Sequence, residues 1–184
     1  LVSEGKRLGL EAIQDDALNV VIKKKATPGY ENSPIVIIQG HMDMVCEKNK
    51  GTEHDFEKDP IKLRVDGDYL YATDTTLGAD NGIAVAMGMA LLASTDIPHP
   101  ALEVVFTSDE EESMNGAMKL NGDLFKGQYI INIDSEEEGT ITVSCAGGVT
   151  AIVTIDKAYK DVDSKVAYII DIKGLLGGHS GMEI

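Results

Sequence analysis

The stretch Ile35-Val36-Ile37-Ile38-Gln39-Gly40-His41-Met42-Asp43 decides the fold. Its first four residues are β-branched and apolar, a run typical of a strand that is buried on both faces. His41 and Asp43 follow where the run ends, separated by one residue, and in extended chain this spacing places both side chains on the same face. The stretch therefore predicts a buried strand that delivers polar side chains from its carboxyl end.

Two further apolar runs end in the same way. Leu102–Phe106 leads into Ser108-Asp109-Glu110-Glu111-Glu112, and Tyr129–Ile133 leads into Asp134-Ser135-Glu136-Glu137-Glu138. Both runs predict buried strands. In an open parallel sheet, ligands bind outside the carboxyl ends of the strands, so we expect these acids to lie at one edge of the sheet.

A helix is expected over residues 80–94, between the first and the second of these strands. Asp80 or Asn81 can cap it. Its residues are apolar nearly all round, which is typical of a buried helix. Strands that alternate with helices predict the α/β class, with a mostly parallel central sheet flanked by helices.

The rest of the chain predicts smaller features and a domain boundary. Residues 1–12 are weakly amphipathic, with apolar residues near helical spacing, and predict a helical segment. Leu63 to Ala72 predicts a hairpin that turns at Asp66-Gly67. Beyond a boundary near residue 146, two alternating strands are expected at Thr150 to Ile155 and Val166 to Ile172. We therefore expect one domain over residues 1–145 and the start of a second over 146–184.

Composition excludes several classes of protein. The 184 residues carry 16 Lys and Arg against 31 Asp and Glu, a net charge of −15, which disfavours nucleic acid as a partner. No apolar run reaches the roughly 18 residues of a membrane span.

Cys46 and Cys145 are expected to be buried free thiols in a reducing cytoplasm. The chain begins as if inside a helix, so we expect it to be a fragment.

The polar strand ends have both ordinary and functional interpretations. Singly, His41 could be a hydrogen-bonded histidine, Glu110 and Glu111 a solvated loop, and Asp134 a turn cap. Together, one His and several carboxylates at one sheet edge match the ligands that zinc or manganese prefers. One acid could then ligate metal while its neighbour takes a proton from water. The set therefore predicts a metal site.

The order of these motifs resembles the M20 metallopeptidases. The family's motifs match His41-Met42-Asp43, Gly78-Ala79-Asp80-Asn81-Gly82, Asp109-Glu110-Glu111 and Asn132–Gly139. The longer strings Thr75–Gly82 and Cys145–Gly148 look most like the aminoacyl-histidine (Xaa-His) dipeptidases of that family. Gly177-Gly178-His179-Ser180-Gly181 resembles the start of the family's smaller α+β lid domain. The resemblance implies a zinc-peptidase-like catalytic domain followed by a truncated lid or dimerisation domain.

The resemblance also implies metal ligands. His41 and Asp134 would bind one metal, Glu111 would bind the other, and Asp80 would bridge the two. The cofactors would be two divalent ions, with zinc expected and manganese or cobalt as alternatives. The family has a second His ligand after the lid, which this chain does not contain. His54 and His99 lie in polar or Pro-rich loops and are expected at the surface, so the fragment would hold an incomplete site.

Three further roles follow from the resemblance. Asp43 would orient His41, Glu110 would be the general base, and His179 would touch the substrate, across a homodimer interface if one forms. Two metals about 3.5–4 Å apart would hold a water whose proton Glu110 accepts and passes to the leaving amine. The implied function is a cytoplasmic metallo-dipeptidase that hydrolyses Xaa-His dipeptides such as β-alanyl-His, and the fragment alone should be nearly inactive.

Two alternatives stay open at this point. The first is another M20 hydrolase, such as a tripeptidase, a carboxypeptidase-like enzyme or a deacylase, because it would use the same metal ligands. The second is a non-catalytic, acidic metal-binding domain, which predicts carboxylates scattered on exposed loops rather than gathered after buried strands.

Overall fold

The computed structural model describes residues 1–135, 137–144, 151–158, 168–171 and 173–174. The chain divides into two compact units, Leu1–Thr142 and Val143–Ile184. Every helix and strand among the described residues belongs to the first unit. The described parts of the two strands expected in the second unit form no strand, and the remainder of both, with His179, lies outside the described residues.

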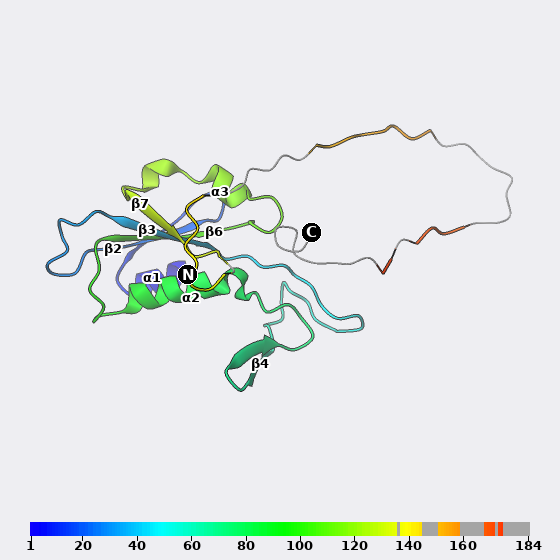
Figure 1. Ribbon diagram of the computed structural model, residues 1–184, viewed down its shortest axis with the longest axis horizontal. Helices are drawn as coiled ribbons and strands as arrows, with labels where there is room; N and C mark the ends of the chain where they lie inside the picture. The colour runs from blue at the N-terminus through cyan, green and yellow to red at the C-terminus, as the bar shows by residue number, and fades with distance from the viewer. Residues whose placement is uncertain (136, 145–150, 159–167, 172, 175–184) are drawn as a thin grey trace. The chain divides into compact units, whose positions relative to one another are not determined.

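A five-stranded sheet forms the centre of the first unit (Figure 1), in the order β1-β2-β6-β3-β7. The strands are β1 (Glu11–Gln14), β2 (Val20–Lys24), β3 (Val36–His41), β6 (Leu102–Thr107) and β7 (Tyr129–Asn132). β6, β3 and β7 run parallel to one another, whereas β2 and β1 extend the sheet in antiparallel fashion. The predicted α/β class is confirmed, and the parallel strands are the three that carry the predicted site residues at their ends.

The central strand β6 is the most deeply buried. All six of its residues are buried, which accounts for its continuous apolar run. Its one charged residue, Glu103, is buried as well, and its carboxylate accepts hydrogen bonds from the backbone N–H groups of Lys126 and Gly127, each at 2.9 Å. The Lys23 ammonium lies 3.6 Å away, so the buried charge has partners.

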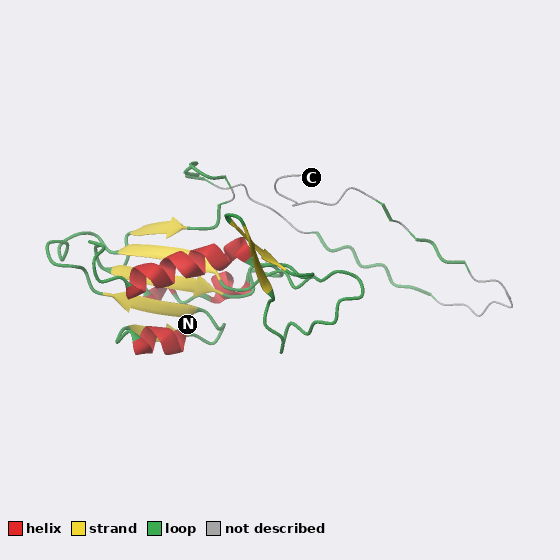
Figure 2. Cartoon of the chain, turned by 90° about the horizontal axis from the view of Figure 1, so that it is seen from below, coloured by secondary structure: helices red, strands yellow, loops and turns green. Residues whose placement is uncertain are grey.

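Helices α1 (Val2–Arg7) and α2 (Ala79–Ala93) cover one face of the sheet (Figure 2). The buried residues of α2 recur at helical spacing, so a single stripe of the helix meets the sheet. That stripe consists of Asn81, Ala84, Gly88 and Leu92. The core beneath it is built from Val20, Ile22, Ile38, Leu92, Leu102, Val104 and Phe106.

Small residues bring α2 close to the sheet. A Cβ atom on Gly40 would lie only 2.3 Å from the Cβ of Ala84, and one on Gly88 would lie 2.9 Å from Val104. Real Cβ atoms do not approach so closely, so the observed spacing requires glycine at both positions. This close contact places the first turn of α2 against the carboxyl end of β3.

The structure corrects two expectations for α2. The helix is not buried all round: Ile83 is 52% exposed and Met87 is 48% exposed, because only one face of the helix meets the sheet in the described residues. Neither Asp80 nor Asn81 caps it. The N-cap is Gly78, with φ at 75°, and no side chain makes a cap hydrogen bond.

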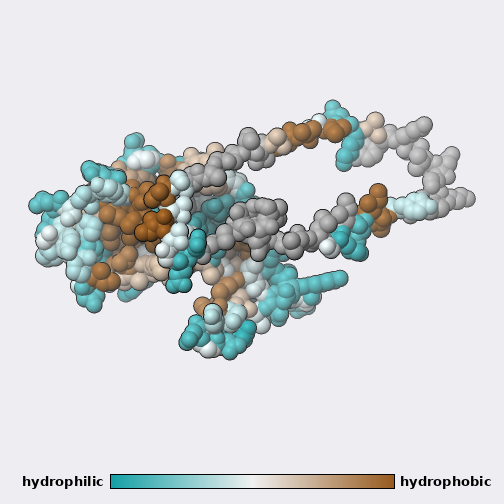
Figure 3. All heavy atoms as spheres, viewed as in Figure 1, coloured by the Kyte–Doolittle hydropathy of each residue, from teal (hydrophilic) through white to brown (hydrophobic). Residues whose placement is uncertain are grey.

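The structure also corrects the prediction that the third strand is buried. All residues of β7 are exposed, since β7 lies at the edge of the sheet. Figure 3 shows an apolar patch in the region where Figure 1 places β7. The three apolar residues of β7, Tyr129, Ile130 and Ile131, are 54–64% exposed.

Two local predictions near the N-terminus and at Cys46 are wrong. The helical segment expected over residues 1–12 ends at Arg7, and Gly9, with φ at 73°, turns the chain into β1. Cys46 is exposed rather than buried, because it lies in a surface loop beyond β3. Cys145 lies outside the described residues.

The remaining elements of the first unit are short. The predicted hairpin is confirmed as β4 (Leu63–Asp66) and β5 (Tyr69–Ala72), which form their own two-stranded sheet. It turns at Gly67-Asp68 rather than at Asp66-Gly67, because Asp66 still pairs with Tyr69. After β6 come α3 (Asn115–Lys119) and the 3-10 helix η1 (Gly122–Leu124). Among the described residues, none of the helices has both the length and the apolar character to cross a bilayer.

Candidate metal centre

The carboxyl ends of the parallel strands bring the predicted ligands together. His41 is the last residue of β3, Asp80 lies in the first turn of α2, Glu111 follows β6, and Asp134 follows β7. One donor atom each from His41, Asp80 and Glu111 can be chosen so that all lie within 4.8 Å of one another. The strand ends therefore form one cluster at a single edge of the sheet.

His41 stands at the middle of this cluster and is almost completely buried, with 1% of its surface exposed. Its Nε2 atom lies 3.0 Å from Asp80 Oδ1, 3.8 Å from Asp134 Oδ1 and 3.9 Å from Glu110 Oε2. The carboxylates thus approach one ring nitrogen from three segments of the chain.

The other ring nitrogen of His41 fixes the orientation of the imidazole. Nδ1 lies 3.0 Å from the backbone oxygen of Asp43, which can only accept, so Nδ1 carries a proton and donates it. The Asp43 carboxylate is farther, at 3.6 Å, and its Oδ2 instead accepts the backbone N–H of Glu111 at 3.1 Å. Asp43 therefore contacts His41 mainly through its main chain and holds the acidic loop after β6 with its side chain.

The acidic loop after β6 turns sharply at Asp109, which has φ at 55°. The Asp109 carboxylate accepts hydrogen bonds from the side chains of Ser113 and Asn115, which hold it in this left-handed conformation. The turn places Glu110 and Glu111 beside His41. Glu110 falls outside the set of three close donors, although its carboxylate remains within 4 Å of the imidazole.

Among the described residues, carboxylates predominate around His41. Burial raises the pKa of Glu110, and the neighbouring carboxylates of Asp134, Glu111 and Asp43 raise it further, while His41 acts in the opposite direction. Burial by itself would lower the pKa of His41, but the Asp80 hydrogen bond and the nearby carboxylates outweigh it and raise the pKa. A cluster with this excess of negative charge favours a bound cation.

The donor set fits a divalent transition metal. One imidazole nitrogen with several carboxylate oxygens is a combination that zinc and manganese accept, and a ring Nδ1–H bound to a carbonyl is the usual arrangement behind a ligating Nε2. His41, Asp80, Glu111 and Asp134 are therefore the residues that could hold metal.

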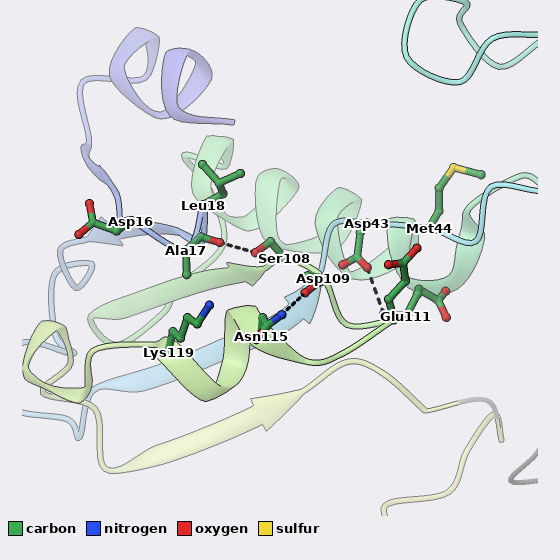
Figure 4. Close-up of a pocket in the computed structure, with 11 residues that line it drawn as sticks. Asp16, Ala17, Leu18, Asp43, Met44, Ser108, Asp109, Glu111, Asn115 and Lys119 are labelled. Carbon is green, nitrogen blue, oxygen red and sulfur yellow. Dashed lines mark hydrogen bonds between the residues drawn. The ribbon is translucent and has the colours of Figure 1, made fainter. Parts of the chain in front are cut away.

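A cavity of about 550 Å³ adjoins the cluster and shares Asp43 and Glu111 with it (Figure 4). Figure 4 shows these two residues and Met44 at one end of the cavity, and Asp16, Ala17 and Leu18 at the other. The motifs gave no sign of this cavity, because the loop before β2 and the loop after β6 meet only in the folded chain.

Two histidines outside the cluster lie where we did not expect them. His54 and His99 were predicted at the surface but are buried, with 8% and 5% of their surfaces exposed. The His54 ring packs edge-on against Phe56, at 4.5 Å between ring centroids, and His99 Nδ1 lies 2.7 Å from the backbone oxygen of Pro100. Polar surroundings in the sequence concealed both contacts.

An α/β sheet whose parallel strands end in one histidine and several carboxylates is an arrangement typical of metallohydrolase domains. The comparison with protein families agrees: the chain belongs to peptidase family M20/M25/M40, whose model matches residues 37–180. The resemblance seen in the motifs is thereby confirmed.

Individual relatives are dipeptidases and peptidase T. The chain is 44% identical over 186 residues to the cytosol non-specific dipeptidase of Escherichia coli K12. This match covers all of this chain and 38% of that protein. It is 37% identical over 86 residues to peptidase T of Pasteurella multocida, covering 45% of this chain and 21% of that protein. The chain thus spans well under half the length of these relatives.

Solved structures show the same fold. Aminoacylhistidine dipeptidase from Vibrio alginolyticus matches with a TM-score of 0.72 and 48% identity, over 75% of this chain and 28% of that chain. A tripeptidase from Staphylococcus aureus matches with a TM-score of 0.58 and 26% identity, over 73% of this chain and 36% of that chain.

Proposed function

We propose that the protein is a metal-dependent dipeptidase that hydrolyses dipeptides of the Xaa-His type. The convergence of His41, Asp80 and Glu111 on one point, with Glu110 and Asp134 beside them, carries this proposal. The dipeptidase names of the most extensive matches support the reaction, and the name aminoacylhistidine dipeptidase supports the substrate class.

Each residue of the cluster has a proposed role. His41 and Asp134 would hold one divalent ion, Glu111 would hold a second, and Asp80 would be a ligand shared by both. Zinc is the metal we propose, with manganese or cobalt as substitutes. The bound ions supply Lewis acidity and lower the pKa of water.

The groups beside the ligands handle protons and substrate. Glu110 takes the proton from the attacking water and gives it to the nitrogen of the leaving amine. Its carboxylate lies beside the ligands, 3.9 Å from His41 Nε2, and a general base must lie within reach of the proton that it takes. Asp43 keeps the proton of His41 on Nδ1, so that Nε2 faces the metal. His179 binds the substrate.

The wider setting is also a proposal. Residues 1–145 would form the N-terminal part of the catalytic domain, and 146–184 would form the start of a lid. The boundary between the two compact units, after Thr142, supports this division. The protein would act in the cytoplasm on small peptides, and the name of the Escherichia coli relative supports both points. Nucleic acid and membranes would not be its partners. It would form a homodimer.

Metal removal and a substrate panel test the proposal on the full-length protein. We expect chelation to abolish hydrolysis of β-alanyl-His and zinc to restore it. Xaa-His dipeptides should be cleaved with a higher kcat/KM than other dipeptides, tripeptides and N-acyl amino acids. Full activity after complete removal of metal would refute the mechanism, and a preference for tripeptides or acyl amino acids would refute the substrate class.

A further inference from the structure

The side chain of Asn81 is buried beside the metal centre and has no role in the chemistry described above. Only 3% of its surface is exposed. Its Oδ1 accepts the backbone N–H of His41 at 3.1 Å, and its Nδ2 donates to the backbone oxygen of Ile133 at 2.5 Å. The carboxamide thus joins the residue that ends β3 to the residue that follows β7.

These two backbone groups are the ones that the parallel ladder would pair next. The ladder between β3 and β7 ends at Gln39 opposite Asn132, followed by the hydrogen bond from Ile133 N–H to the Gln39 oxygen. In a parallel pair the next bond would run from the N–H of His41 to the oxygen of Ile133. The Asn81 carboxamide instead lies between these groups and bonds to both.

The insertion has a geometric consequence. Because a carboxamide occupies the place of a direct hydrogen bond, β3 and β7 separate at the point where His41 and Asp134 leave the sheet. Gly40 provides the space, since a Cβ there would lie 2.3 Å from Asn81 Oδ1. Asn81 is also the neighbour of Asp80 in sequence, so one residue connects three ligand-bearing segments.

We propose that Asn81 is a positioning residue that sets the distance between His41 and Asp134 and couples both to Asp80. The inference rests on the proposed function, because it assumes that these residues bind metal. Asn is suited to the task because its side chain both accepts and donates, as a peptide group does. Groups that orient metal ligands typically contribute 10–100-fold to metal affinity.

The test compares Asn81→Ala with Glu103→Gln in the full-length protein. Glu103 is also buried and binds the N–H groups of Lys126 and Gly127 where the chain enters β7, at the end of the strand away from the ligands. Three quantities are measured: the Kd for zinc by chelator competition, the visible spectrum of the cobalt-loaded protein, and the midpoint of urea unfolding without metal.

We expect Asn81→Ala to weaken zinc binding about 10–100-fold and to change the cobalt spectrum. Glu103→Gln should lower the unfolding midpoint yet keep the wild-type Kd and spectrum. Asn81→Asp keeps the shape and the acceptor for His41 but loses the donor to Ile133, so its cobalt spectrum should change as well.

Wild-type affinity and an unchanged spectrum in both Asn81 variants would overturn the proposal. It would also be overturned if both stayed unfolded at saturating zinc while Glu103→Gln folded, because the role of Asn81 would then be structural. Failure of the wild-type protein itself to bind zinc or cobalt would refute the proposed function instead.

Discussion

Replacing each of the two adjacent acids after β6 by glutamine should separate chemistry from metal binding. Glutamine has nearly the shape of glutamate, and the loop is held by main-chain and neighbouring contacts that neither substitution removes. In particular, the backbone N–H of Glu111 donates to Asp43, and the Asp109 turn is held by Ser113 and Asn115. Any effect should therefore come from the carboxylate that is lost.

The expected effects differ because the two carboxylates lie differently. Glu110 is 3.9 Å from His41 Nε2 and outside the close donor set, so Glu110→Gln should keep both metals. It removes the proton acceptor, and general-base catalysis is worth about 10²–10⁴-fold, so kcat should fall by at least 10², or about 2.7 kcal/mol in activation free energy. Glu111→Gln replaces an anionic ligand by a neutral amide and should lower metal content.

The assay pairs metal stoichiometry, by elemental analysis after dialysis, with kcat for β-alanyl-His in the full-length enzyme. Loss of metal from Glu110→Gln together with full metal in Glu111→Gln would show that the roles are exchanged. Wild-type stoichiometry and kcat in both variants would refute the metallohydrolase assignment.

Three further outcomes are expected. Gly40→Ala places a methyl group 2.3 Å from Ala84 Cβ and should lower the free energy of unfolding by about 1–3 kcal/mol. Gly82 is an exposed position of α2, where a new Cβ meets no other part of the protein within 4 Å, so Gly82→Ala should raise the free energy of unfolding by about 0.5–1 kcal/mol. Urea unfolding followed by circular dichroism measures both. Phe106→Ala, which truncates a core residue that is 1% exposed, should cost about 3–5 kcal/mol by the same method, and a loss below 1 kcal/mol would contradict the packing described. The pKa of His41 is raised in the metal-free protein, and a ligating imidazole must be unprotonated at Nε2, so zinc affinity should decrease as pH falls through that pKa. Calorimetry in buffers of different ionisation enthalpy measures the protons released on zinc binding. A number of released protons that does not change with pH would contradict this expectation.

The parallel strands and their polar ends could be predicted because local sequence determines them. A run such as Leu102–Phe106 has no strong helical periodicity, and a chain that leaves a buried strand must turn at the sheet edge. The order of the strands fixes which ends are neighbours, and parallel β6, β3 and β7 bring theirs to one edge. The gathering of His41, Asp80 and Glu111 therefore follows from topology together with composition.

What could not be predicted depends on contacts between distant parts of the chain. His99 is buried because its main chain bonds Thr27, 72 residues away, and nothing in its own surroundings indicates this. The exposure of β7 reflects its edge position rather than its apolar sequence. Asn81 looks like a helix cap in sequence, yet its partners lie 40 and 52 residues away.

The arrangement at the sheet edge is one that the fold imposes against electrostatic repulsion. Several carboxylates surround a single imidazole, and the raised pKa of Glu110 shows that the nearby charges and burial disfavour its ionised form. Core packing holds them there: β6 is buried along its whole length, and α2 sits against β3 through Gly40 and Ala84. Bound cations would relieve this repulsion. The same packing that makes the metal-free cluster unfavourable therefore keeps its donors oriented for metal, since little conformational freedom remains to be lost on binding.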